Sequence, residues 1–268
     1  MQLPANIVAI IQARTGSTRL PGKIMLPLAG EPLLYRMVQR VLQSKLCSHV
    51  VVATTTDPSD DEVVRLCTKY NLNCFRGHPA DLLDRHYRAA LDYDADIVLK
   101  IPSDCPLIDP SIIDKGIRHF LDHWPNYDYS GNLHPASYPD GNDVEIMTFQ
   151  ALEKAWKEAV RPLEREHCTP YLWENPDKFR IGSFTWECGL DYSMSHRWTI
   201  DYPEDYQFIE RIYSELYQKN PHFGIDDILK VVSKEDIFNI NSKYAGVNWY
   251  RNHLKELKTI SPEQTKQI

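Results

Sequence analysis

The first half of this sequence alternates short apolar runs with stretches of helical periodicity, and this alternation restricts the fold more than any other feature. Residues 6–11 (NIVAII), 49–53 (HVVVA) and 96–101 (DIVLKI) are nearly continuous apolar runs, as in strands covered by helices on both faces. A weaker strand is predicted at residues 74–75. Amphipathic helices are predicted at residues 33–42, 62–67, 81–93 and 110–121. This order predicts an α/β, Rossmann-like fold with a mostly parallel sheet flanked by helices.

Three of the predicted helices have recognisable first turns. Ser59 and Glu62 have the spacing of a capping box, in which the two side chains satisfy backbone amides at the start of a helix. Asp109 is followed by Pro110, and this pair favours a helix that begins there. Pro203 is likewise predicted to start a helix.

The rest of the chain has a different pattern. Residues 125–197 are rich in aromatic residues, proline and polar residues, with one clear helical pattern near 149–160, and we interpret them as a lobe inserted over the edge of the sheet. The predicted catalytic domain spans residues 1–215. Residues 216–268 are predicted to form a helical appendage, with residues 259–268 as a flexible tail.

Charge and cysteine content narrow the class of protein. The formal net charge is −7, from 37 acidic and 30 basic residues, which disfavours binding to a nucleic-acid polymer. No apolar run approaches the roughly 20 residues of a membrane span, and the first residues do not have the pattern of a signal peptide. The six cysteines are scattered without a C-x-x-C pair, so neither a disulfide framework nor a zinc site is expected. These features together favour a cytoplasmic protein.

A polar loop follows the first predicted strand, at residues 12–23 (QARTGSTRLPGK). In an open α/β sheet, ligands bind beyond the carboxyl ends of the strands. Gly16 and Gly22 allow backbone amides to approach an anion closely. Three cations lie within ten residues, at Arg14, Arg19 and Lys23. The loop therefore favours a triphosphate ligand over the alternative of a solvated basic turn.

The loop differs from two well-known phosphate motifs. Five residues rather than four separate Gly16 from Gly22, and Ile24 stands where a Walker A loop has the Ser or Thr that holds magnesium. The loop does not match G-x-G-x-x-G either. It therefore needs metal ligands from elsewhere in the chain.

Two aspartates are candidates for that role. Asp104 follows the strand at 96–101, and Asp201 precedes the helix predicted to begin at Pro203. Attack on an α-phosphate needs a hard cation held by one or two carboxylates, with water and phosphate completing its shell. The structural alternatives are a turn residue for Asp104 and a helix cap for Asp201.

The loop resembles the R-x-x-S-x-R-L-P-G-K signature of the CMP-Kdo and acylneuraminate cytidylyltransferases, and within that superfamily the chain most resembles the SpsF group. The matching residues are Arg14, Ser17, Arg19, Leu20, Pro21, Gly22 and Lys23. The resemblance covers about residues 6–215. It implies the nucleotide-diphospho-sugar transferase fold, similar to the GT-A fold, and a loop that wraps the triphosphate of CTP, with Arg14 and Lys23 on the β and γ groups.

The same resemblance extends to the acidic segments. Residues 102–110 are similar to the superfamily's G-D-x-P-L-I-D-P segment, with Ser103 in place of the usual glycine, and residues 201–205 are similar to its D-x-P-E-D segment. The resemblance implies that Asp104 and Asp201 each supply a Mg²⁺ ligand.

Further matches to the SpsF group suggest an acceptor site. Asp143 and Glu145 lie in a P-D-G-x-D-V-E run, two residues apart on one side of a strand, and could bind the acceptor or simply form salt bridges at a sheet edge. Arg165 and His167 lie in an R-E-H segment that could hold an anionic acceptor or form an ion pair at a helix end. Asp81 also matches the group, as does Arg85.

The predicted reaction joins CTP to a sugar or sugar acid, giving a CMP-sugar and pyrophosphate, in a Mg²⁺-dependent enzyme that forms a homodimer. Arg14, Lys23, Asp104 and Asp201 are the expected catalytic residues. The expected nucleotide site consists of Gln12, Ala13, Arg14, Gly16, Ser17, Arg19, Lys23, Asp81, Arg85 and Ser103. Three alternatives stay open: another nucleotide or a phosphorylated acceptor, a glycosyltransferase that uses a finished nucleotide sugar, and a non-catalytic binding protein derived from the enzyme.

Overall fold

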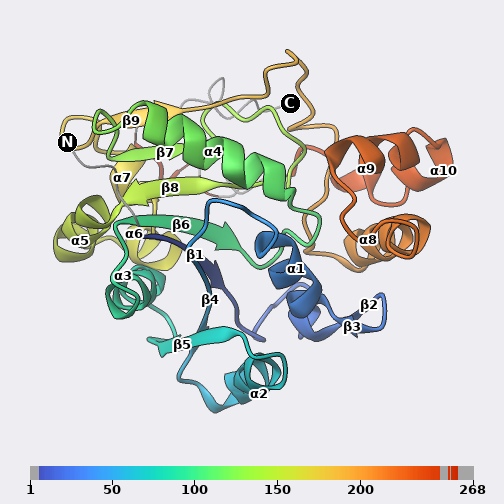
Figure 1. Ribbon diagram of the computed structural model, residues 1–268, viewed down its shortest axis with the longest axis horizontal. Coiled ribbons are helices and arrows are strands. Elements are labelled where there is room, and N and C mark those ends of the chain that lie inside the picture. The colour runs from blue at the N-terminus through green and yellow to red at the C-terminus, as the bar shows by residue number, and fades with distance from the viewer. Residues whose placement is uncertain (1–5, 248–252, 254, 259–268) are drawn as a thin grey trace.

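The computed structural model describes residues 6–247, 253 and 255–258, and its centre is a seven-stranded sheet in the order β5-β4-β1-β6-β8-β7-β9 (Figure 1). β1 pairs in parallel with β4 and β6, and β4 with β5. The predicted mostly parallel sheet is therefore confirmed. The strands are β1 (Ile7–Gln12), β4 (His49–Thr55), β5 (Asn73–Gly77), β6 (Ile97–Pro102), β7 (Tyr129–Gly131), β8 (Glu145–Thr148) and β9 (Ile181–Ser183), with a separate hairpin of β2 (Pro27–Leu28) and β3 (Glu31–Pro32).

The helices follow the predicted positions closely in the first half of the chain. The described helices are α1 (Leu33–Val41), α2 (Asp61–Lys69), α3 (Leu82–Asp92), α4 (Pro110–Asp122), α5 (Phe149–Glu158), α6 (Pro162–His167), α7 (Pro170–Trp173), α8 (Pro203–Leu216), α9 (Ile225–Val232) and α10 (Glu235–Phe238). The side chain of Asp109 caps α4 by accepting a hydrogen bond from the Ser111 amide at 2.7 Å. The predicted starts at Pro110 and Pro203 are both confirmed.

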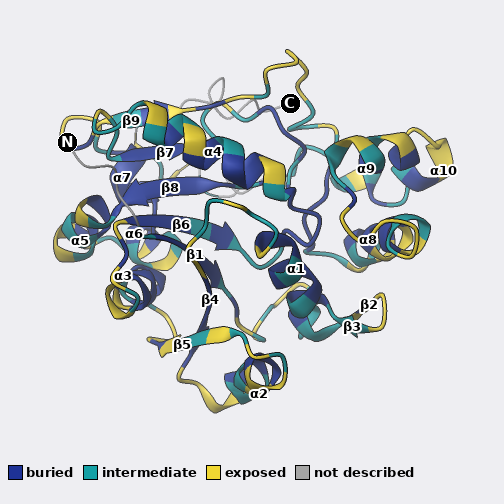
Figure 2. Ribbon diagram, in the orientation of Figure 1, coloured by how far each residue is buried: buried dark blue, intermediate teal, exposed yellow. Residues whose placement is uncertain are grey.

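Helices cover both faces of the sheet because successive residues of β1 point to opposite sides. On one face, Ala9 and Ile11 pack in a core with residues of α1, α2 and α4. On the other face, Val8 and Ile10 pack with residues of α3, α5 and α7. Figure 2 shows the central strands buried and the outer surfaces of the helices exposed.

Residues 125–197 extend this sheet at its β6 edge. β8 runs antiparallel to both β6 and β7, whereas β7 and β9 are parallel. β7, β8 and β9 therefore continue the central sheet. A third core joins α8, α9 and α10 to Trp198 and Leu107, and Figure 1 shows these three helices together at one side of the molecule. The predicted tail at residues 259–268 lies outside the described residues.

The strand order reverses direction at β1, and this reversal places the site. The chain passes from β1 to β4 and β5 on one side and then crosses to β6 on the other. The parallel register aligns Gln12 with Pro102, so the segments after β1 and β6 leave the sheet side by side. Ligands of open α/β sheets bind at such a switch point. No helix within the described ranges is both long and apolar enough to cross a membrane.

Candidate active site

The segment after β1 is held in place by a buried carboxylate. Asp60, with 2 % of its surface exposed, accepts hydrogen bonds from the Thr15 amide at 2.7 Å and from the Thr15 hydroxyl at 2.9 Å. Gly22 then adopts φ = 65°, a conformation that favours glycine, immediately before Lys23. The Gly22 amide donates to the Thr15 carbonyl at 3.1 Å, so the loop is closed on the residue that Asp60 anchors.

The predicted capping box at Ser59 and Glu62 is wrong. The amide and hydroxyl of Ser59 both donate to Asp57, and no side chain caps α2. Asp60 is the residue before α2, but its carboxylate turns toward Thr15. Of the acidic residues at this helix start, Asp60 therefore anchors the loop.

Lys23 brings the two predicted metal ligands together. Its Nζ lies 3.1 Å from Asp201 Oδ1 and 3.5 Å from Asp104 Oδ2, and it also donates to the Ile200 carbonyl at 2.6 Å. Burial acts to lower the pKa of Lys23, but the charges of Asp104 and Asp201 outweigh it and raise that pKa above its ordinary value. The two aspartates, nearly a hundred positions apart in the sequence, thus converge on one ammonium group.

Backbone contacts hold the two aspartate segments against each other. The carbonyl of Asp104 accepts hydrogen bonds from the Ile200 amide at 2.9 Å and from the Thr199 hydroxyl at 3.0 Å. Arg19 from the loop adds a further contact, with Nη2 at 2.7 Å from Asp201 Oδ1. The loop, the turn after β6 and the segment before α8 therefore meet at one point.

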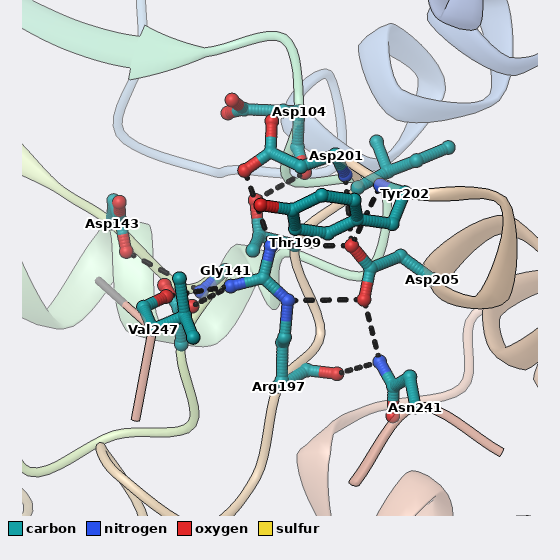
Figure 3. Close-up of polar contacts among 12 residues, drawn as sticks. Asp104, Gly141, Asp143, Arg197, Thr199, Asp201, Tyr202, Asp205, Asn241 and Val247 are labelled. Atoms are coloured by element: carbon teal, nitrogen blue, oxygen red, sulfur yellow. Dashed lines mark hydrogen bonds and ion pairs between the residues drawn. The ribbon is translucent and has the colours of Figure 1, made fainter. Parts of the chain in front are cut away.

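A buried arginine lies behind Asp201. Arg197 Nη2 lies 3.1 Å from Asp201 Oδ2 (Figure 3), and Nη1 lies 3.3 Å from Asp140 Oδ2. Gly141 allows this approach, because its φ is +109° and an added Cβ would lie 2.7 Å from the carbonyl carbon of Trp198. Burial acts to lower the pKa of Arg197, but Asp140 and Asp205 outweigh it and raise that pKa.

Charged groups also lie on β6 and β8. The antiparallel register aligns Lys100 with Glu145, and the two side chains form a buried ion pair. Glu145 Oε2 accepts a second hydrogen bond from the Tyr129 hydroxyl at 2.7 Å. Burial acts to raise the pKa of Glu145, but Lys100 outweighs it and lowers that pKa. Among the described residues no cation forms an ion pair with Asp143, and its pKa is raised to about 6 by burial and then by the charge of Asp104.

Most of these charged groups line one cavity of about 510 Å³, whereas Asp60 and Asp205 lie behind its wall. One half carries the loop, the segment before α3 and α3 itself, including Gln12, Ala13, Arg14, Gly16, Ser17, Arg19, Lys23, Pro79, Ala80 and Arg85. The other half carries Lys100, Asn132, Asp140, Asn142, Asp143, Glu145, His167 and Trp173. Ser103, Asp104, Arg197 and Asp201 also line it. The volume is sufficient for a small-molecule ligand.

Two predicted site residues do not line this cavity. Asp81 caps α3 by accepting from the Asp84 amide at 2.9 Å, and its Oδ2 also accepts from Arg165. Arg165 in turn donates to the Trp156 carbonyl at 2.7 Å. Neither Asp81 nor Arg165 is among the residues that line the cavity. Instead, their side chains form an ion pair with each other.

Sequence reasoning missed three charged residues of the site. Lys100 is a lysine inside an otherwise apolar strand, and a buried lysine requires a partner, so the strand pattern itself was a signal. Asp140 lies three residues before Asp143, and Arg197 lies four residues before Asp201. Neither spacing indicates that the side chains of Asp140 and Arg197 form an ion pair.

The comparison with protein families decides the class. The cytidylyltransferase family model matches residues 8–235, which include the loop and both aspartates of the site. The chain belongs to the cytidylyltransferase family. It is accordingly a nucleotidyltransferase enzyme.

Individual relatives agree with this assignment. The spore coat polysaccharide biosynthesis protein SpsF of Bacillus subtilis is 30 % identical over 85 % of this chain and 95 % of its own length, so the predicted resemblance is confirmed. An uncharacterized protein of Methanocaldococcus jannaschii is 37 % identical over 88 % of this chain and 95 % of its own. The 3-deoxy-manno-octulosonate cytidylyltransferase of Trichlorobacter lovleyi is 37 % identical over 43 % of this chain and 45 % of its own.

Solved structures support the fold. A cytidylyltransferase from Leptospira borgpetersenii, 34 % identical, superposes with a TM-score of 0.81 over 90 % of this chain and 98 % of its own. A CMP:2-keto-3-deoxy-manno-octonic acid synthetase complexed with CTP has a TM-score of 0.60 over 78 % of this chain and 99 % of its own. At 18 % identity the latter shows a shared fold alone.

Proposed function

We propose that this enzyme transfers CMP from CTP to a hydroxyl of a sugar or sugar acid in a Mg²⁺-dependent reaction that releases pyrophosphate. The observation that carries the proposal is the convergence of Lys23, Asp104 and Asp201 beside the loop, within one cavity. A cationic loop and paired carboxylates are the groups that a metal-bound triphosphate requires.

The loop cations would neutralise the triphosphate. Arg14 is exposed at the cavity wall, and Lys23 is held at the aspartates. We assign Arg14 and Lys23 to the departing pyrophosphate, with Arg19 and the backbone of Gly16 and Ser17 positioning the phosphate chain. Neutralising the leaving group lowers the barrier to attack without covalent catalysis by the protein.

The donor set fits Mg²⁺ bound together with a nucleotide. Within the described ranges, no three His, Cys, Asp or Glu side chains lie close enough to hold a metal ion by themselves. Mg²⁺ commonly takes one or two carboxylates and completes its shell with phosphate oxygens and water. Asp104 and Asp201 are such a pair, since both lie within 3.5 Å of Lys23 Nζ. The bound ion would polarise the α-phosphate toward attack.

Two buried polar atoms are available to bind the base. Gln12 Oε1 and Arg85 Nε line the nucleotide half, and neither has a hydrogen-bond partner among the described residues. Cytosine carries an amino group that donates, whereas uracil carries a carbonyl oxygen at the same position. An unpaired acceptor on Gln12 and an unpaired donor on Arg85 fit the edge of a base that carries both kinds of group, and we assign them to the cytosine of CTP.

The acceptor would lie in the other half of the cavity. Asp143 and the Lys100–Glu145 pair present carboxylate and ammonium groups to hydroxyls there. Burial and then His253 lower the pKa of His167 to about 3, so this histidine would act as a neutral hydrogen-bond partner. We assign Asp143, Glu145 and His167 to acceptor binding, and Arg165 to holding α3 through Asp81.

We also propose that the product serves the synthesis of a surface polysaccharide, as the name of the SpsF relative suggests, and that the enzyme works in the cytoplasm as a homodimer. Light scattering of the purified chain tests the dimer directly. A monomer at micromolar concentration would contradict that part of the proposal.

Pyrophosphate release tests the reaction. The chain is incubated with Mg²⁺, one of the four ribonucleoside triphosphates, and a panel of sugars, sugar acids and phosphorylated polyols. Release that requires both CTP and an acceptor supports the proposal, and mass spectrometry then identifies the CMP-sugar. Pyrophosphate release with UTP and an acceptor, but not with CTP, supports the alternative of another nucleotide. Glycosyl transfer from a nucleotide sugar without pyrophosphate release supports a glycosyltransferase. Asp104→Asn is the matched inactive control.

A further inference from the structure

Arg197 is surrounded by carboxylates, and it contacts only one of the two carboxylate oxygens of Asp201. Its side chain is only 4 % exposed. Nη2 lies 3.1 Å from Asp201 Oδ2, whereas Asp201 Oδ1 faces Lys23 at 3.1 Å and Arg19 at 2.7 Å. One oxygen is therefore held by Arg197 (Figure 3), and the other is directed toward the loop cations.

A second carboxylate, that of Asp205, also holds the arginine. Its carboxylate is fully buried and accepts from Arg197 Nε at 3.0 Å and from Arg197 Nη2 at 3.1 Å. Asp205 Oδ2 also accepts from the amides of Asp201 and Tyr202, at 2.9 and 3.0 Å. The same buried carboxylate thus holds both the Asp201 backbone and the arginine that contacts the Asp201 side chain.

The C-terminal segment completes this network. Asn241 Nδ2 donates to Asp205 Oδ1 and to the Arg197 carbonyl, both at 2.9 Å. Arg197 Nη1 donates to the Val247 carbonyl at 2.8 Å. Both residues lie beyond residue 235, where the match to the family model ends. A segment outside the shared family region therefore contacts the groups that hold a proposed metal ligand.

We propose that Arg197 is a positioning residue that presents Asp201 to the metal through Oδ1 alone, and that Asn241 and Val247 make the C-terminal segment part of the active site. This inference rests on the proposed function. A carboxylate held in one orientation loses less rotational freedom when it binds a metal, and partners behind a ligand commonly change metal affinity by about 10- to 100-fold.

The planar guanidinium is essential to this role. Arginine places its nitrogens in a fixed fork that reaches Asp201, Asp140 and Asp205 together, whereas a lysine ammonium is a single point of charge. Arg197→Lys keeps the charge and removes the fork. We expect it to raise the Mg²⁺ concentration for half-maximal rate by about 10-fold or more, while the KM for CTP changes much less.

Arg36→Lys is the matched control. Arg36 is also a buried arginine, and it donates to the carbonyls of Leu28 and Ala29 and to the Tyr217 hydroxyl, none of which belongs to the residues that line the cavity. Both substitutions are expected to lower the melting temperature. A purely structural role for Arg197 would leave the two variants with the same metal dependence.

The test measures Mn²⁺ affinity by electron paramagnetic resonance in the presence of CTP, together with the Mg²⁺ dependence of the rate. Weaker Mn²⁺ binding in Arg197→Lys but not in Arg36→Lys supports the proposal. Affinities within twofold of wild type in Arg197→Lys, or equal losses in both variants, overturn it. Asn241→Ala is the second variant if Arg197→Lys does not fold, with a smaller loss in the same direction expected and an unchanged affinity contradicting the role. Failure of the wild type to release pyrophosphate overturns the proposed reaction, whereas Mn²⁺ affinity still decides the role of Arg197.

Discussion

Replacing Lys23 by methionine should strengthen metal binding in the absence of nucleotide and lower turnover with CTP. Without a nucleotide, the ammonium neutralises Asp104 and Asp201, at 3.5 and 3.1 Å. A metal ion that binds alone must displace it from both carboxylates. With CTP present, the ammonium can transfer to the phosphates and leave the carboxylates to the metal. Methionine keeps the length of the side chain and removes the charge.

The contact distances give the magnitude. At an effective dielectric constant near 20, charges about 3 Å apart attract by roughly 5 kcal/mol, and desolvation offsets much of this. A net value of about 1.5–3 kcal/mol is typical of a hydrogen bond between charged groups. Since about 1.4 kcal/mol corresponds to a tenfold change, Lys23→Met should bind metal alone about 10- to 150-fold more tightly than wild type. Its turnover with CTP should fall by about 100-fold or more.

The assay is a Mn²⁺ titration without nucleotide, followed by electron paramagnetic resonance, on wild type, Lys23→Met and the control Lys69→Met. Lys69 is exposed and lies near Glu31, away from the residues that line the cavity. Tighter Mn²⁺ binding and lower turnover in Lys23→Met alone would support the account. A folded Lys23→Met variant that binds Mn²⁺ no more tightly than wild type would refute the exchange of partners.

Four further changes test other parts of the structure. Gln12→Leu should lower the preference for CTP over UTP by about tenfold in kcat/KM, and an unchanged ratio would remove Gln12 from base recognition. Asp60→Ala frees the Thr15 amide and hydroxyl and should raise the KM for CTP by about tenfold or more, measured beside the melting temperature. Burial lowers the pKa of His86 to about 3, whereas the unfolded chain keeps the ordinary value of 6.5. Between these two pH values the unfolded chain binds a proton at His86 that the folded chain does not bind. The free energy of unfolding should then fall by about 1.4 kcal/mol per pH unit, and urea titrations of His86→Gln should show a shallower fall. The pKa of Asp143 is raised to about 6, so stability is lost as the pH rises through that value, and Asp143→Asn should melt higher at pH 8 but not at pH 4 while losing acceptor binding.

The sequence predicted the fold well because local patterns determine it. The apolar runs at β1, β4 and β6 and the helical periodicities between them fall where the structure has those elements. The loop could be placed at the ligand edge because it directly follows β1, and the topology of open sheets fixes that edge.

The contacts within the site depended on tertiary structure that no spacing reveals. The Asp104 and Asp201 segments meet through hydrogen bonds from residues 199 and 200 to the Asp104 carbonyl. Asp60 anchors Thr15 across 45 positions of sequence. Arg165 was expected at the acceptor but reaches Asp81, because α6 packs beside α3.

A crystal structure with Mn²⁺ and a non-hydrolysable CTP analogue tests the central claim most directly. The account predicts an anomalous peak about 2.0–2.2 Å from Asp104 and from Asp201 Oδ1 and next to an α-phosphate oxygen, with Lys23 Nζ moved onto the phosphates. A metal bound by phosphates alone, with Lys23 still paired to Asp201, would contradict it.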